Sequence, residues 1–100
     1  MNFIASTFSN TCNFFITEEA INDLILNAVS DTKGVKLAQK PRIIFNKNHD
    51  NVEIVVDVKV KRNILLKEGL ENIKNEIQRQ YLSLLNIKPT SIRVCFIEYY

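Results

Sequence analysis

The chain has 100 residues, of which 46% are hydrophobic and 24% charged, and its formal net charge is +2. This length suits a single domain, and the composition is typical of a folded globular protein rather than a disordered or membrane-embedded one. The small net charge argues against nucleic acid or an anionic membrane surface as partner, because affinity for polyanions grows with the number of phosphates neutralised.

Residues 1–10, MNFIASTFSN, lack the basic start and unbroken apolar run of a signal peptide. No later segment reaches the roughly 18 apolar residues that a membrane-spanning helix needs, so we expect a cytoplasmic protein without direct membrane insertion. Residues 1–10 show no clear period and are expected either to be disordered or to cover another surface, whereas residues 11–100 should form one domain. In the cytosol Cys12 and Cys95 are expected to be reduced and to behave as small hydrophobic residues.

A short strand, TCNFFI, is expected before the first helix, with Cys12, Phe14 and Ile16 facing inward. Thr17 is a natural N-cap, and the adjacent carboxylates of Glu18 and Glu19 suit the positive end of the helix dipole better than an acid–base pair. Gly34 is expected to end this helix in a left-handed conformation. The helix repeat places five apolar residues on one face: Ile21, Leu24, Ile25, Ala28 and Val29.

The central segment predicts a β-hairpin formed by residues 41–45 and 51–61. The connecting NKNHDN is rich in turn-forming residues and contains His49, the sole histidine, which we interpret as an exposed turn residue because it has no partners for a metal site. In the second strand alternation is strict and directs five side chains to one face: Val52, Ile54, Val56, Val58 and Val60.

A longer second helix is indicated by six apolar residues at helical spacing: Leu66, Leu70, Ile73, Ile77, Tyr81 and Leu84. Asn86 should end it and Pro89 prevents its continuation, after which SIRVCFIEYY is expected to be a strand with Ile92, Val94 and Phe96 inward. The resulting order, β-α-β-β-α-β, predicts a two-layer α+β domain with two helices on one face of a small, mostly antiparallel sheet of three or four strands.

No catalytic or cofactor motif is found. The only glycines are Gly34 and Gly69, which excludes a phosphate-binding loop of the GxGxxG type and the GxxG clamp that holds single-stranded RNA. One histidine and two separated cysteines do not predict a zinc site or an activated nucleophile. We therefore expect neither an enzyme nor a requirement for a metal, nucleotide or redox cofactor.

The stretch ITEEAINDLILNAVSDTKGVKLA resembles the opening of the alkaline shock protein family, the envelope stress response proteins of low-GC Gram-positive bacteria and their relatives. The family's I-(S/T)-x-E helix start and closing glycine–valine pair have matches in five residues: Ile16, Thr17, Glu19, Gly34 and Val35. VEIVVDVKVK is similar to the family's long alternating strand, and the segment from GLENIKNEI to VCFIE to its second helix and final strand. The resemblance covers about residues 14–98.

This resemblance implies a non-enzymatic cytosolic module for self-assembly or protein interaction, linked to cell-envelope stress and homeostasis. Its implied partner is another copy or a different protein, in some members a membrane-anchored one that holds the module at the inner face of the membrane. The same succession of elements also resembles ribosome-binding factor A and other K-homology-like domains, so an RNA- or ribosome-binding module is the alternative.

The sheet face opposite the helices is the expected interaction surface, because apolar side chains remain among its outward positions. These candidate interface residues are Phe15, Ile44, Val55, Cys95, Ile97 and Tyr99. Charged outward residues are expected to form a polar rim around them: Arg42, Glu53, Asp57, Lys59 and Arg93. The alternative is that residues 1–10 fold across this face.

Overall fold

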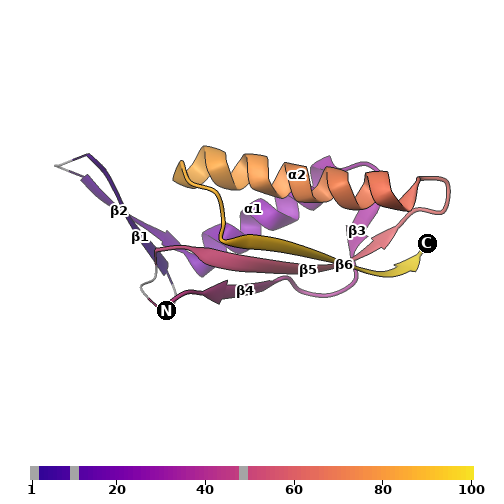
Figure 1. Ribbon diagram of the computed structural model, residues 1–100, viewed down its shortest axis with the longest axis horizontal. Helices are drawn as coiled ribbons and strands as arrows, with labels where there is room; N and C mark the ends of the chain where they lie inside the picture. Colours follow the sequence, from indigo (N-terminus) through magenta and orange to yellow (C-terminus); the bar gives the residue numbers. More distant parts are fainter. Residues whose placement is uncertain (1–2, 10–11, 48–49) are drawn as a thin grey trace.

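A computed structural model describes residues 3–9, 12–47 and 50–100, with side chains described from Thr17 onward. Two helices pack on one face of a four-stranded sheet, and a separate two-stranded hairpin extends beyond the end of that sheet (Figure 1). The predicted α+β architecture with both helices on one side is therefore confirmed. The elements run in the order β1, β2, α1, β3, β4, β5, α2, β6.

The long strand β5 (Val52–Val60) organises the sheet. Strands β3 (Val35–Leu37) and β4 (Arg42–Phe45) pair antiparallel with successive parts of β5, whereas β6 (Ser91–Tyr99) pairs parallel with it. Because β6 follows β5 along most of its length, β3 and β4 must share the opposite edge. The predicted β4–β5 hairpin is confirmed, and His49 lies outside the described residues.

Helix α1 (Glu18–Asp31) begins where its sequence predicts. The Thr17 hydroxyl accepts a hydrogen bond of 3.2 Å from the Ala20 amide, and Glu18 and Glu19 occupy the first turn. Its five predicted apolar residues are all buried. The helix ends three residues before Gly34, with Thr32 as its C-cap, so Gly34 instead turns the chain toward β3 at a φ of +75°.

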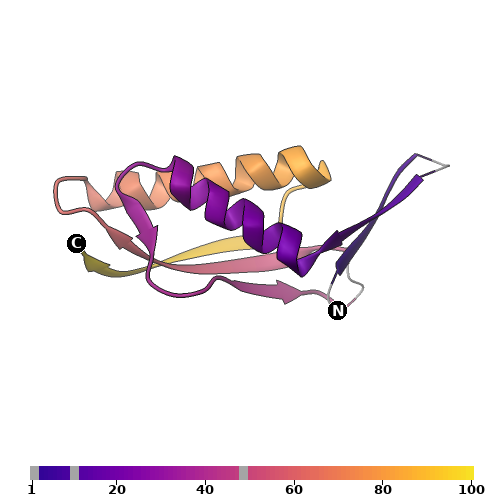
Figure 2. The ribbon, with the colours of Figure 1, turned by 180° about the vertical axis from the view of Figure 1, so that it is seen from behind.

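Helix α2 (Leu66–Leu85) lies beside α1 and above β5 and β6, as the two opposite views show (Figures 1 and 2). Asn86 ends it, as predicted, and adopts the left-handed conformation there. The last inward residue is Leu85, which is 1% exposed, and not the predicted Leu84, which is 41% exposed. The angular drift of a straight helix over several turns accounts for this difference of one position.

The core lies between the helices and the inner face of β5. All five inward residues predicted for this strand are 0% exposed, and the inward residues of β6, Ile92, Val94 and Phe96, pack against the same cluster while remaining partly exposed. Each fully buried aliphatic side chain of this kind contributes about 1.5–3 kcal/mol before the entropy cost of folding. Strand β5 is therefore the element that holds the two layers together.

The N-terminal part differs from the prediction. Strand β2 (Cys12–Thr17) does not join the main sheet but pairs antiparallel with β1 (Phe3–Ser9) in a separate two-stranded sheet. Residues 3–9 are thus in a strand, and the hairpin points away from the sheet face that they were alternatively expected to cover (Figure 2). Strand β3 was also not predicted, because three residues are too few to show a period.

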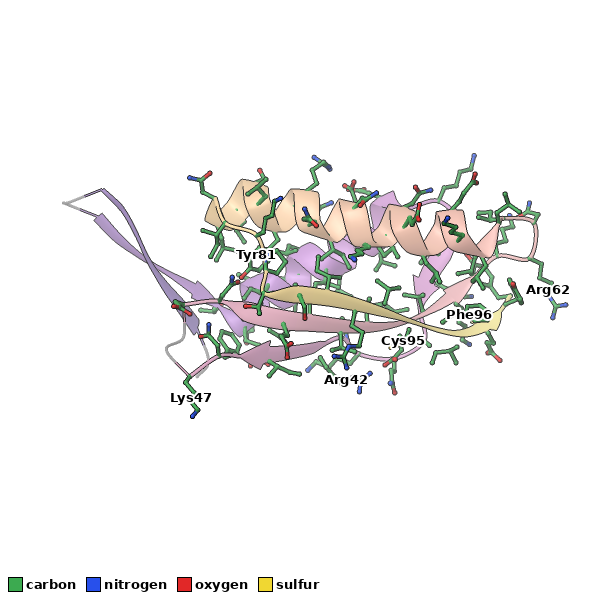
Figure 3. All side chains as sticks on the ribbon, in the orientation of Figure 1. Arg42, Lys47, Arg62, Tyr81, Cys95 and Phe96 are labelled. Atoms are coloured by element: carbon green, nitrogen blue, oxygen red, sulfur yellow. The ribbon has the colours of Figure 1, made fainter. Side chains whose placement is uncertain are left out.

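Tyr81 connects the core to the end of the β4–β5 hairpin, and Figure 3 shows it between α2 and the sheet. The side chain is 0% exposed, and its hydroxyl donates a hydrogen bond of 2.7 Å to Asn51 Oδ1. Burial raises the pKa of Tyr81 to about 12, although a contact with the Val52 backbone opposes the shift. The phenol is therefore held in its neutral form well above its ordinary pKa.

Replacing Tyr81 with phenylalanine should lower the free energy of unfolding by about 1 kcal/mol at pH 8, through loss of this hydrogen bond. The unfolded chain ionises this tyrosine from about pH 10, whereas the folded protein does so only near pH 12. Wild type therefore loses stability in that interval through an ionisation that the variant lacks. Urea unfolding at pH 8 and pH 11 should show the cost of the substitution shrinking; a constant cost would contradict the assignment.

Candidate protein-interaction surface

The outer face is the side of the main sheet that points away from the helices. In Figures 1 and 2 both helices lie on the other side, and none of the described elements crosses this face. The register of β4, β5 and β6 places on it a group of outward side chains: Arg42, Ile44, Glu53, Val55, Asp57, Lys59, Arg93 and Cys95. The surface expected from the sequence thus exists as an open face.

The centre of the outer face is an ion pair between a buried carboxylate and a half-exposed arginine. The Asp57 side chain is 6% exposed and accepts hydrogen bonds of 3.1 and 2.9 Å from Arg42 Nη2. Gln39 Nε2, from the segment between β3 and β4, donates a further hydrogen bond to Asp57 Oδ2. Figure 3 shows Arg42 on the side of the sheet away from the helices. Three segments are therefore fixed to one carboxylate in the middle of the surface.

Asp57 was expected in an exposed polar rim, and this expectation is wrong because Arg42 and Gln39 cover its carboxylate. Val55, expected as an exposed interface residue, is only 8% exposed. It lies between Arg42 and Arg93 in the strand register, where long side chains on both neighbouring strands shield it. One signal in the sequence could have indicated this burial: an aspartate lies within an apolar strand, and the strand expected to pair with it supplies an arginine.

Two of the other predicted residues lie far apart on the face and are half exposed. Ile44 on β4 is 50% exposed, and Ile97 on β6 is 51% exposed. Cys95, beside Asp57 in the register, is a free thiol of intermediate exposure. The face is therefore a set of separated apolar positions around a polar centre, with less exposed apolar area than the sequence predicted.

Tyr99 and Phe15 do not belong to the outer face. The β5–β6 register shifts after Phe96, so that Glu98 lies opposite Lys59 and Tyr99 opposite Val60. Ile97 is the extra residue, and Tyr99 is thereby turned to the helix side, where its ring lies 4.8 Å from that of Phe96. Phe15 is in β2, which lies outside the main sheet, and its side chain is not among those described.

Polar contacts fix both ends of the outer face. Ser91 Oγ donates a hydrogen bond of 3.1 Å to Glu53 Oε1 at one end of β6, and Lys59 Nζ lies 3.0 Å from Glu98 Oε1 at the other. Each contact joins β5 to β6. Together with the Arg42–Asp57 pair between β4 and β5, they brace the surface across three strands.

The carboxylates of α1 line a separate shallow hollow of about 370 Å³, where Glu18, Glu19 and Asp23 face Lys40. Thr17 capping explains the position of the first two, as predicted from the sequence. Among residues 3–9, 12–47 and 50–100, no three His, Cys, Asp or Glu side chains are grouped as ligands for a metal ion.

A second hollow, of about 290 Å³, is basic and lies at the C-terminal end of β5. Lys33, Lys61 and Tyr100 are among the residues that line it, and Lys36 Nζ lies 4.2 Å from the centre of the Tyr100 ring. A cation over an aromatic face is attracted by the ring quadrupole. The positive charges of Lys33, Lys36 and Lys61 at this end of the domain attract anions.

Within the described part of the chain, neither helix combines the length and the apolar character required to cross a bilayer. Comparisons with protein-family models, with curated proteins and with solved structures find no match to the chain.

Proposed function

We propose that the protein is a non-enzymatic cytoplasmic module that associates with other protein molecules, a second copy among them, through the outer face of its sheet. The observation that supports this best is the open face itself, on which the exposed side chains of Ile44 and Ile97 lie on either side of an ion-paired centre. A mixture of exposed apolar and polar side chains is compatible with a non-obligate protein interface, which as a whole is about as apolar as the rest of a protein surface.

The hydrogen bonds that hold the side chains at the centre of the outer face favour a binding role over a catalytic one. A surface whose side chains are already held by hydrogen bonds loses little conformational entropy when a partner arrives. The Arg42–Asp57 pair satisfies its own charges, so a partner can cover it without stranding a charge. The resemblance to the alkaline shock protein family further supports a role in cell-envelope homeostasis, with a membrane-anchored protein as one partner at the inner face of the membrane.

The test is the molar mass of the protein, measured by multi-angle light scattering at tens of micromolar. We expect wild type to exceed a monomer and Ile44→Glu to form smaller particles, because the new charge would be desolvated in the interface. Leu26→Glu on the outward side of α1 is the matched control, since Leu26 is 44% exposed. A monomeric wild type, or equal losses for both variants, would show that the outer face does not mediate self-association.

RNA or ribosome binding is the second candidate function, and the basic hollow with Lys33, Lys61 and Tyr100 favours it. Lysines neutralise phosphates, and an aromatic ring provides a surface for base stacking. A gel shift with ribosomal RNA at physiological salt tests this function. Binding that is lost in Lys33→Glu/Lys61→Glu but kept in Ile44→Glu would favour it over the first.

A further inference from the structure

Strand β6 forms an open edge of the main sheet. Among the described strands it pairs with β5 alone, and it pairs in parallel. A strand with one neighbour directs half of its backbone amide and carbonyl groups away from that neighbour, where they are free to pair with another chain. Its nine residues, SIRVCFIEY, contain no lysine or proline, the residues that most often protect an edge. The edge is thus available to a second strand.

The core is also incomplete along this edge. The inward side chains Ile92, Val94 and Phe96 are only partly buried, whereas every inward side chain of β5 is 0% exposed. Helix α2 lies above β6 (Figure 1), and these three side chains nevertheless remain partly exposed. A further strand beside β6 would cover them.

We propose that β6 pairs antiparallel with the β6 of a second copy about a two-fold axis that passes at Cys95. One sheet would then continue across both copies, and their outer faces would join into one surface. This inference rests on the proposed function, because it supplies a second contact for self-association. Edge pairing makes a dimer, and contacts between outer faces then join the dimers.

The bulge at Ile97 makes this register consistent with the two faces of the sheet. Pairing that is centred on Cys95 places Val94 opposite Phe96 of the second copy, and both are inward residues. Beyond the bulge it places Ile92 opposite Tyr99 of the second copy. Tyr99 is inward only because Ile97 is an extra residue, so the apolar contacts extend along the whole strand on the helix side.

Charge complementarity selects the same register. It places Arg93 opposite Glu98 of the second copy on the outer side, twice across the axis. Arg93 is exposed and takes part in none of the ion pairs among the described residues. The Glu98 side chain contacts Lys59 of its own copy and is still 60% exposed. It can therefore also accept a hydrogen bond from Arg93 of the second copy. A register centred on Val94 would place Arg93 opposite Cys95 and form no charge pair.

The first experiment is a charge exchange, read by sedimentation equilibrium in the Ile44→Glu background, where face contacts are removed. We expect this background to be a dimer, and Arg93→Glu or Glu98→Arg to weaken it roughly tenfold by placing like charges opposite each other. The double variant Arg93→Glu/Glu98→Arg should restore the affinity. Circular dichroism checks that each variant is folded. Single variants as tight as their parent, or a double variant as weak as either single one, would overturn the register.

The second experiment tests directly whether the two-fold axis passes at Cys95. In a Cys12→Ser background, dibromobimane, a short reagent that links two thiols, should join Cys95 of one copy to Cys95 of the other and yield a covalent dimer. Cys95→Ser should yield none. Failure to cross-link while the protein is dimeric would place the axis elsewhere and overturn the proposal.

The failures are distinguishable from one another. If Ile44→Glu is already monomeric while wild type is an oligomer, edge pairing is wrong and the proposed function stands. If wild type itself is monomeric, self-association is wrong and the edge pairing fails with it.

Discussion

Arg42→Ala should lower the free energy of unfolding by about 1.5–3 kcal/mol, because the carboxylate of Asp57 loses its cation and two charge-assisted hydrogen bonds, which water replaces only in part. The Asp57 side chain is 6% exposed and that of Arg42 is 56% exposed. Breaking a fully buried pair costs about 3–5 kcal/mol, and the exposure of Arg42 reduces this figure because water can reach the vacated position. The hydrogen bond from Gln39 remains. Urea denaturation followed by circular dichroism measures the loss.

A second substitution separates the stranded charge from lost packing. Asp57→Asn in the Arg42→Ala background removes the uncompensated charge and should recover part of the stability, which simple loss of side-chain contacts would not allow. Arg79→Ala is the matched control, because Arg79 pairs with Glu76 on the exposed side of α2 and its removal should change stability little. If Arg42→Ala behaves like Arg79→Ala, the pair has no structural role.

Gly34→Ala should destabilise the protein by about 2–3 kcal/mol for two independent reasons. Gly34 has a φ of +75°, a left-handed conformation that costs a residue with a side chain about 1 kcal/mol or more. A Cβ atom there would overlap Ile64 Cδ1, so that the side chain of Ile64 would have to move out of its place at the edge of the core. Thermal and urea unfolding should both show the loss.

Ile64→Val distinguishes the two contributions, because it removes the Cδ1 atom and keeps the rest of the side chain. The double variant Gly34→Ala/Ile64→Val should therefore lose less stability than the sum of the single variants. Gly69→Ala is the comparison for crowding without a left-handed backbone. Gly69 lies in α2, where alanine favours the helix, but its Cβ would meet Val60 Cγ1 at 3.1 Å, so that this side chain must shift slightly. If Gly34→Ala/Ile64→Val, in which the clash is relieved, is as stable as Ile64→Val, the left-handed conformation of Gly34 makes no contribution.

The fold was predictable wherever the apolar pattern was long. Strand β5 alternates over nine residues and α1 repeats over several turns, and every side chain predicted to face inward from these two elements is buried. Strand β3 has three residues, and the β1–β2 hairpin is set by pairing between segments without a clear period, so neither could be read from local pattern. The sheet order, with β6 parallel to β5, depends on contacts distant in sequence and was not predicted.

The sequence predicted only some of the residues of the outer face, partly because the backbone of β6 contains a bulge. Alternation located Ile44, Val55 and Cys95 on the outer face, but it cannot detect a bulge, and one extra residue turned Tyr99 to the other side. The exposure of a side chain was harder to predict than the face of the sheet on which it lies. Val55 and Asp57 face outward as expected and are nevertheless buried, because Arg42 extends from the neighbouring strand.

The parallel position of β6 has a consequence for the order in which the chain folds. Strand β4 reaches β5 through a short turn, whereas β6 reaches it only after the whole of α2 has been traversed. Bringing the two ends of this long connection together costs chain entropy before β6 forms any stabilising contact with β5. This difference favours early assembly of the β4–β5 hairpin against α1, with α2 and β6 docking last. Strand β6 would then also be the first to detach, leaving the backbone groups along that edge of β5 unpaired and open to a strand of another chain.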